Sequence, residues 1–347
     1  MLVYIVSCIL SICFTYIASK NRRYFCFHIL AVLIPILLLA CRDISVGTDT
    51  KHYYSIFENS QEFDIASFWI STRMEYLYTL ILFYVGYLGL SYNVLLFILA
   101  ILTIVPVYIA SFRMSYKLSP TLMMFLYYMM YYQYAFNISR QAIAMSLILL
   151  ATTYLLENKK FPVVLLSFLA LGFHNLTVIY CGIVVLYMLR NRGSFFMKLF
   201  FISILVILLF IFRSKFDYYE DTYLATSSSG FQVSYTITMI INFILILSSS
   251  SDSYYLRNKK NYLFFSIIIL LLNLTSLLSE WFFRISLFVD ILSLLMISNV
   301  LKSEQIKKKS YKRVLYILFA IFFWFFVFVI NNSGETLPYT SGILSIK

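Results

Sequence analysis

A run of polar residues interrupts an otherwise apolar chain between Arg42 and Tyr54. It contains Thr48, Asp49 and Tyr53, together with a glycine, a second threonine and a histidine. An arginine guanidinium forms paired hydrogen bonds with phosphate or carboxylate, and an aspartate can accept a proton in catalysis. Charged groups beside lipid are costly and often functional. The run is therefore a candidate wall of a binding or catalytic site.

Asp49, and Glu75 further along the chain, also have a structural interpretation. Asp49 or Thr50 would cap a helix predicted over 51–59. Glu75 opens the next apolar segment, where it is either a general base or an acidic residue favoured by the helix N-terminus. The residue types and their spacing leave both interpretations open.

Three further sites in the sequence, with five residues between them, could carry chemistry. Asn137, Arg140 and Gln141 share the i, i+3, i+4 spacing of one helix face, which predicts a lined cavity; a snorkelling arginine is the alternative. His174 lies at a predicted helix break and is either a base or phosphate donor or a satisfied structural group. Arg284 follows an acidic residue by four positions, so a structural ion pair is the simplest interpretation.

The elements that must position these residues are membrane helices. The chain has 347 residues, of which 62% are hydrophobic and only 12% charged, too few charges to cover a soluble domain. Apolar runs of about 17–22 residues recur along it, the length that crosses a bilayer. We therefore predict an all-α, polytopic membrane protein whose residues 1–347 form a single transmembrane domain.

We expect about 12 transmembrane segments. They are 1–19, 24–41, 75–90, 93–112, 120–136, 140–156, 161–189, 195–213, 232–250, 261–279, 284–301 and 314–331. The stretch 161–189 is too long for one upright helix and is predicted to be a hairpin of two short helices. Two longer polar loops, 42–74 and 214–231, are predicted to be external, the first with short amphipathic helices.

The net charge of +12 comes from basic residues that gather in short loops, as expected for cytoplasmic loops. No basic helix carries interleaved stacking aromatics, so nucleic acid is not a predicted partner. Placing the basic loops inside puts 42–75 and His174 outside. The two halves of the chain nevertheless disagree by one crossing between 75 and 120, so a segment there is re-entrant or falsely assigned.

The order of these motifs resembles that of the EpsG family, a branch of the Wzy-type polysaccharide polymerases. The residues that carry the resemblance are Arg42, Val46-Gly47-Thr48-Asp49-Thr50, Tyr53, Glu75-Tyr76, Ser139-Arg140-Gln141-Ala142-Ile143-Ala144 and Phe173-His174-Asn175. The match in order and spacing covers residues 40–180, while the C-terminal half is similar mainly in hydropathy.

The resemblance implies a glycosyltransferase at the bacterial cytoplasmic membrane. It would join oligosaccharide repeat units carried on undecaprenyl diphosphate into O-antigen, capsule or exopolysaccharide on the outer face. Its partners would be that lipid-linked oligosaccharide, the lipid bilayer, and a chain-length regulator and flippase of the same pathway. A lipid diphosphate leaving group needs fixed cations. The residues predicted to bind it are Arg42, Thr48, Tyr53, Asn137, Arg140, Gln141 and Arg284.

The acceptor hydroxyl must lose its proton as the sugar carbon becomes oxocarbenium-like. Asp49, Glu75 and His174 are the candidate bases, and we favour Asp49, with Glu75 positioning hydroxyls. No cofactor and no metal ligand set is predicted, although the question of a divalent ion stays open. A flippase or exporter is the alternative: it would use the same arginines without a base, but with cations along a path to both faces.

Overall fold

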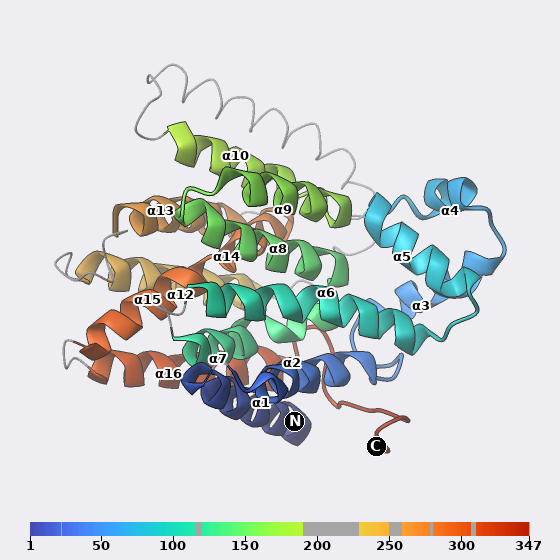
Figure 1. Cartoon of the computed structure of the whole chain (residues 1–347), viewed down its shortest axis with the longest axis horizontal. Helices are drawn as coiled ribbons and strands as arrows, with labels where there is room; N and C mark the ends of the chain where they lie inside the picture. Colours follow the sequence, from blue (N-terminus) through green and yellow to red (C-terminus); the bar gives the residue numbers. More distant parts are fainter. Residues whose placement is uncertain are drawn as a thin grey trace.

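The computed structural model describes residues 1–21, 23–114, 119–189, 229–249, 259–277, 280–306 and 310–346. In this part of the chain there are 15 α-helices, and the only β-structure is an isolated bridge between Ser341 and Ile346. Most helices lie side by side, and α3, α4 and α5 project at one end (Figure 1). The predicted all-α class is confirmed.

The α-helices are α1 Leu2–Lys20, α2 Phe25–Ala40, α3 Thr50–Glu58, α4 Ile65–Thr72, α5 Tyr76–Tyr87, α6 Tyr92–Arg113, α7 Pro120–Met130, α8 Ser139–Leu156, α9 Lys160–Phe173, α10 Thr177–Leu189, α12 Ser229–Ser248, α13 Lys259–Ser276, α14 Glu280–Asp290, α15 Ser293–Ile306 and α16 Ser310–Trp324. Short 3₁₀-helices follow α3 (η1, Asn59–Gln61) and α7 (η2, Tyr132–Phe136), and a π-helical turn, η4, covers Phe325–Ile330.

Four described helical segments are long and apolar enough to cross a membrane: α1, α6, α8 and Tyr311–Ile330. The bent pair α14 and α15 raises this number to five, and several shorter apolar helices accompany them. These segments indicate a multi-pass membrane protein. The predicted number of about 12 spans is not reached in the described residues. The predicted span 195–213 and most of the predicted loop 214–231 lie outside them, and α12 begins within the end of that loop.

Two predicted spans have a different form in the structure. The segment 284–301 is not one helix, because α14 and α15 meet at a bend of 43°. The segment 75–90 contains only the 12 residues of α5, about 18 Å of helix against about 30 Å of hydrocarbon. It packs against α4, where the Trp69 and Tyr76 rings lie 5.9 Å apart. If 75–90 does not cross the membrane, the number of crossings between 75 and 120 falls by one. The N-terminal and C-terminal halves of the chain then agree on which side of the membrane the basic loops lie.

Two other predictions agree with the structure. The stretch 161–189 forms α9 and α10, which are separated by a short break at His174. The segment 42–74 carries the short helices α3 and α4. Both the break and the end of the bundle that carries α3 to α5 contribute to the site described below.

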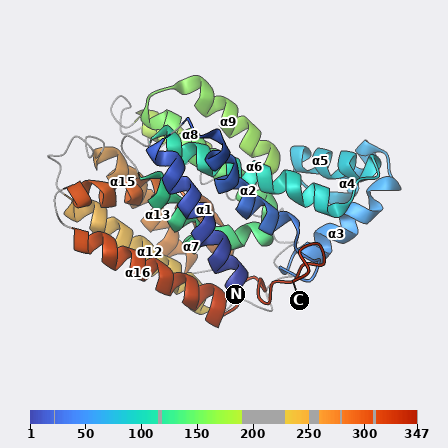
Figure 2. The same cartoon turned by 60° about the horizontal axis from the view of Figure 1, so that its bottom comes forward.

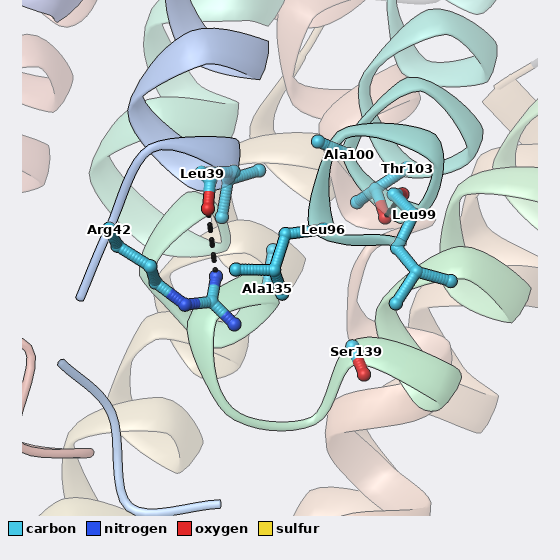
Figure 3. Close-up of a pocket in the computed structure, with 8 residues that line it drawn as sticks. All are labelled: Leu39, Arg42, Leu96, Leu99, Ala100, Thr103, Ala135 and Ser139. Atoms are coloured by element: carbon cyan, nitrogen blue, oxygen red, sulfur yellow. Dashed lines mark hydrogen bonds between the residues drawn. The ribbon is translucent and has the colours of Figure 1, made fainter. Parts of the chain in front are cut away.

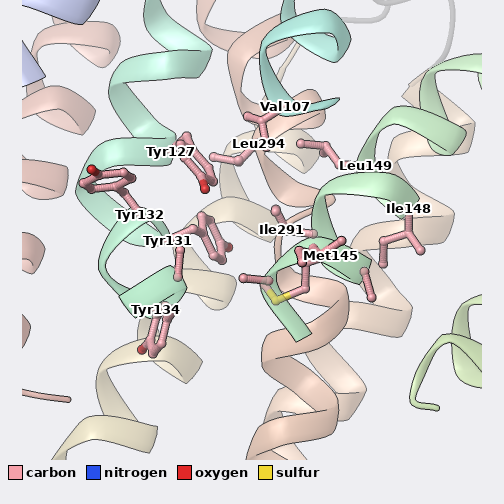
Figure 4. Close-up of a cluster of buried hydrophobic side chains, with 14 of the residues drawn as sticks. Val107, Tyr127, Tyr131, Tyr132, Tyr134, Met145, Ile148, Leu149, Ile291 and Leu294 are labelled. Carbon is pink, nitrogen blue, oxygen red and sulfur yellow. The ribbon is translucent and has the colours of Figure 1, made fainter. Parts of the chain in front are cut away.

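Helix α8 lies in the centre of the bundle. Of its apolar window, 89% is buried, against 33% for α1. Figure 4 shows its side chains, such as Met145 and Leu149, facing tyrosines of α7 and η2 and Ile291 from the bend between α14 and α15. A helix surrounded by protein holds its first turn rigidly. Helix α8 therefore fixes the positions of Arg140 and Gln141, which lie in that turn.

The segment 331–346 after η4 folds back onto the polar run after α2 (Figure 2). The backbone N–H of Asp43 donates to Thr340 O at 3.0 Å, and that of Gly47 donates to Glu335 O at 3.0 Å. The Tyr339 hydroxyl donates to Leu38 O at 3.0 Å. We call residues 331–346 the C-terminal strap. Sequence reasoning missed it, although its Asn, Ser, Gly and Pro content indicated a loop.

Asp290 is fully buried at the bend between α14 and α15. Its Oδ1 accepts a 2.7 Å hydrogen bond from Asn273 Nδ2, while Asp290 Oδ2 and Asn273 Oδ1 have no partner. No described cation pairs with this carboxylate. Burying an uncompensated charge is costly, and an asparagine would offer Asn273 both an acceptor and a donor without that charge.

We therefore expect Asp290→Asn to unfold in detergent at the wild-type temperature or above it. Asp290→Leu would leave the Asn273 amide without its partner, at a cost of about 1–3 kcal/mol, and should unfold several degrees lower. Thermal unfolding followed by tryptophan fluorescence measures both variants. A lower unfolding temperature for Asp290→Asn than for Asp290→Leu would contradict this account.

Candidate functional site

Glu75 is the centre of a hydrogen-bonded network that joins helices α3, α5, α8 and α9. Its Oε2 accepts from Arg140 Nη1 at 2.6 Å, and its Oε1 lies 3.0 Å from His174 Nδ1 and accepts from the Asn175 backbone N–H at 3.2 Å. Arg140 Nε also donates to the Tyr53 hydroxyl at 3.2 Å. The side chain of Glu75 is only 6% exposed. The network thus brings together an arginine, a glutamate and a histidine that are distant in the sequence.

The network decides what Glu75 can do. Burial disfavours its charged form, but the Arg140 guanidinium and the hydrogen bond from His174 outweigh burial, and together they hold the pKa of Glu75 below its usual range. A carboxylate with a lowered pKa is a weak base. Glu75 also does not cap α5 with its side chain, although it occupies the N-cap position. Its position favours orienting Arg140 and His174 over taking a proton itself.

The same network orients His174. Because Glu75 is charged, His174 Nδ1 donates to it, so Nε2 is the nitrogen that carries the lone pair when the ring is neutral. This Nε2 is buried and has no hydrogen-bond partner. The ring lies in the break between α9 and α10, as predicted, and packs near Phe288 with 6.1 Å between centroids. In the neutral ring, Nε2 is therefore a proton acceptor that is buried away from solvent.

Asp49 is half-buried and lies at the N-cap of α3, yet its side chain makes no capping hydrogen bond. The capping role considered from the sequence is therefore not the role of its carboxylate. Burial raises the pKa of Asp49, and the charges of Arg284 and Arg140 and a hydrogen bond from Thr48 oppose this effect. A raised pKa and partial exposure suit a carboxylate that accepts a proton from a bound hydroxyl.

Two other predicted binding residues, Asn137 and Gln141, lie near Asp49 and Arg140 but are buried. The predicted helical face is corrected at Asn137, which lies in the turn before α8. Both ends of its amide are used: Nδ2 donates to Gly334 O at 2.9 Å, and Oδ1 accepts from the Thr48 hydroxyl at 3.2 Å. Gln141 Nε2 donates to Arg284 O at 3.0 Å and so joins α8 to α14. Asn137 and Gln141 thus support the site from within the protein.

Arg42 lies apart from the Glu75 network. It is 4% exposed and projects into a small cavity lined by residues of α2, α6, η2 and α8, including Leu96 and Ser139 (Figure 3). Its Nη1 donates to Leu39 O at 3.4 Å, its guanidinium lies 5.0 Å from the Phe136 ring centroid, and its Nε has no partner. This placement favours holding the loop from inside over contact with a bound substrate.

Of the predicted residues, the structure therefore brings Thr48, Asp49, Tyr53, Glu75, Arg140, His174 and Arg284 together at one end of the bundle. In the described part of the chain, no group of three His, Cys, Asp or Glu side chains is placed to hold a metal ion. Asn175 was named from the sequence only as part of the motif around His174; that its backbone N–H completes the Glu75 network was not predicted, because a backbone donor has no sequence signature.

The lowered pKa of Glu75 makes a prediction about stability. A carboxylate with a lowered folded-state pKa stabilises the protein above its unfolded pKa, about 4.3, and loses this contribution as the pH falls towards the folded value. We expect wild type to be more stable than Glu75→Gln above pH about 5, and this difference to shrink below pH about 4.3. Unfolding temperatures of the two proteins against pH measure it. A constant difference down to pH about 3 would contradict the ion-pair assignment.

Comparison with known proteins identifies one family. A sequence model described as the EpsG family matches residues 25–341. No curated protein and no solved structure matches the chain. The matched range includes the polar run after α2, the Glu75 network and most of the C-terminal strap.

Proposed function

The chain belongs to the EpsG family, which is linked to polysaccharide biosynthesis, and from this premise we propose that it is a membrane glycosyltransferase of the Wzy type. It joins oligosaccharide repeat units carried on undecaprenyl diphosphate into surface polysaccharide. The reaction takes place on the outer face of the bacterial cytoplasmic membrane. The repeat units reach it through the flippase of the pathway, and a chain-length regulator acts on the product.

One observation carries the proposal: a half-buried carboxylate with two arginines around it. Burial raises the pKa of Asp49, and the positive charges of Arg284 and Arg140 oppose this rise; Arg140 is held in place by Glu75 at 2.6 Å. Transfer from a lipid diphosphate needs a proton acceptor beside cations that receive the developing negative charge. Binding of the lipid diphosphate by a transporter requires only the cations, whereas glycosyl transfer requires the proton acceptor as well.

The reaction can be assigned to residues step by step. The hydroxyl of the acceptor sugar gives its proton to Asp49 as its oxygen forms a bond to the anomeric carbon of the donor. The bond between that carbon and the diphosphate oxygen breaks, and the lipid diphosphate leaves with the electron pair. Arg140 and Arg284 stabilise the charge on the leaving group. Tyr53 and Glu75 hold Arg140 in its position.

Cells that carry single variants test the proposal against the flippase alternative. Asp49→Ala or Arg140→Ala in a polymerase should leave single repeat units on the cell surface and no longer chains, because export does not depend on this protein. Surface polysaccharide from these cells is separated on a gel. Chains of normal length would contradict the proposal, and a surface without even single units would favour a flippase.

A further inference from the structure

The C-terminal strap forms hydrogen bonds with Gly47 and Thr48, the two residues that precede Asp49. The backbone N–H of Gly47 donates to Glu335 O at 3.0 Å, and that of Thr48 donates to Gly334 O at 3.3 Å. Neighbouring contacts extend the same interface: Ser45 Oγ and Thr340 Oγ1 lie 3.2 Å apart. The turn before Asp49 is thus bonded to residues almost 300 positions away in the chain.

Asn137 ties the strap, the turn and helix α8 together. Its amide nitrogen donates to Gly334 O on one side, and its amide oxygen accepts from the Thr48 hydroxyl on the other. The donor bond to a carbonyl fixes which end of the amide is nitrogen. Thr48 lies between two acceptors, because its hydroxyl is also 3.2 Å from Asp49 Oδ1. A displacement of the Asn137 amide would therefore move the Thr48 hydroxyl, and through it the carboxylate of Asp49.

Two glycines leave room for this amide. A Cβ atom on Gly334 would lie 2.1 Å from Asn137 Nδ2, and one on Gly47 would lie 2.7 Å from Asn137 Oδ1. Both distances are far inside van der Waals contact. Both glycines also have positive φ values, 81° and 96°, which L side chains rarely adopt. Any side chain at either position would push the amide of Asn137 out of its place.

We infer that the C-terminal strap is a positioning element of the active site, and that Gly334 and Asn137 are positioning residues that set the place of Asp49. Neither residue contacts substrate in this account. The inference rests on the proposed function, because it assigns the strap a role in the polymerisation step. It predicts that damage to the strap lowers the rate of that step while the bundle stays folded and continues to bind the lipid-linked unit.

Gly334→Ala in the purified full-length protein tests this inference, with polymerisation of lipid diphosphate-linked repeat units as the assay. Because small displacements of a reacting group are costly, we expect kcat to fall on the order of tenfold to a hundredfold, with little change in KM and with the protein still folded at the assay temperature. A wild-type kcat, or a loss confined to KM, would overturn the inference.

Two other glycines provide matched controls. Gly89 has a positive φ of 66°, as Gly334 does, but a Cβ there would meet no atom within 4 Å. Gly342 lies in the strap itself, and a Cβ there would be 3.7 Å from Asp43 Oδ1, an ordinary contact. Gly89→Ala and Gly342→Ala should each keep kcat within about twofold of wild type. An equal loss in either control would assign the effect of Gly334→Ala to backbone strain or to general damage.

A double variant tests the route through Asn137. Asn137→Ala alone should lower kcat as Gly334→Ala does. Once the amide is absent, the added methyl group no longer displaces it, so Gly334→Ala in the Asn137→Ala background should change kcat by less than about threefold. Losses that multiply would show that the two residues act independently, which would overturn the assigned route.

A cysteine pair separates failure of the inference from failure of the proposed function. Ser45→Cys and Thr340→Cys, with the exposed Cys13 and Cys26 replaced by Ser, should form a cross-link under mild oxidation whatever the protein's activity. If wild type polymerises and Gly334→Ala does too, only the inference about the strap fails. If wild type makes no polymer, the proposed function fails, and the cross-link alone reports the packing of the strap. Absence of the cross-link would overturn the inference by itself.

Discussion

Asp49→Asn is expected to abolish polymer formation and to leave the protein folded. The amide has nearly the shape of the carboxylate and can still accept a hydrogen bond from Thr48, which lies 3.2 Å away. It cannot take the proton of the acceptor hydroxyl. General base catalysis contributes about 10²–10⁴-fold to a rate, so the loss should be within this range. Polymer yield on a gel, normalised to folded protein, measures it.

Asp64 offers a matched control in the same segment. It is exposed at the N-cap of α4, where its side chain accepts from the backbone N–H groups of Ala66 and Ser67. Asparagine is also a good N-cap residue, so Asp64→Asn should polymerise at the wild-type rate. Wild-type activity in Asp49→Asn would remove Asp49 as the base and would direct attention to His174.

Arg140→Ala should both stop polymerisation and destabilise the fold. It removes the cation closest to Glu75, whose side chain is 6% exposed, and leaves a buried carboxylate without its ion pair. Breaking such a pair from one side costs about 3–5 kcal/mol. The same substitution removes a charge that the lipid diphosphate needs. Unfolding temperature and polymer yield therefore both fall, for different reasons.

The two reasons can be separated by a second substitution. Glu75→Gln in the Arg140→Ala background removes the unpaired charge, so stability should recover in part while polymer yield stays at background. Arg113→Ala is the matched control, because Arg113 pairs with Glu157 between α6 and α8 with both side chains 19% exposed. It should lower stability without stopping polymerisation. Recovery of polymer in the double variant would show that Arg140 serves only the fold.

The all-helical membrane architecture could be predicted from hydropathy, because apolar runs long enough to cross a bilayer are visible in the sequence. The errors came from helices whose length or bending depends on their neighbours. Helix α5 is apolar enough for a span but is held beside α4, and α14 ends at Asp290 although the apolar pattern continues. In both places tertiary packing, which local sequence does not encode, decided the outcome.

The residues of the site were found because their types are rare among apolar helices, but their roles depended on partners far along the chain. Glu75 looked like a candidate base until Arg140 and His174 were placed against it. Arg42 looked like a diphosphate ligand, and its burial beside Phe136 favours a supporting role. Contacts across nearly the whole chain, such as Asn137 with Gly334, have no signature in a single sequence.

Incubation of the purified protein in detergent with lipid diphosphate-linked repeat units tests the central claim most directly. Detergent removes the two sides of the membrane, so only a chemical activity can be observed. We predict a ladder of products on a gel and the release of one lipid diphosphate for each new linkage, both lost in Asp49→Asn. Intact lipid-linked units after incubation with folded wild-type protein would contradict the claim.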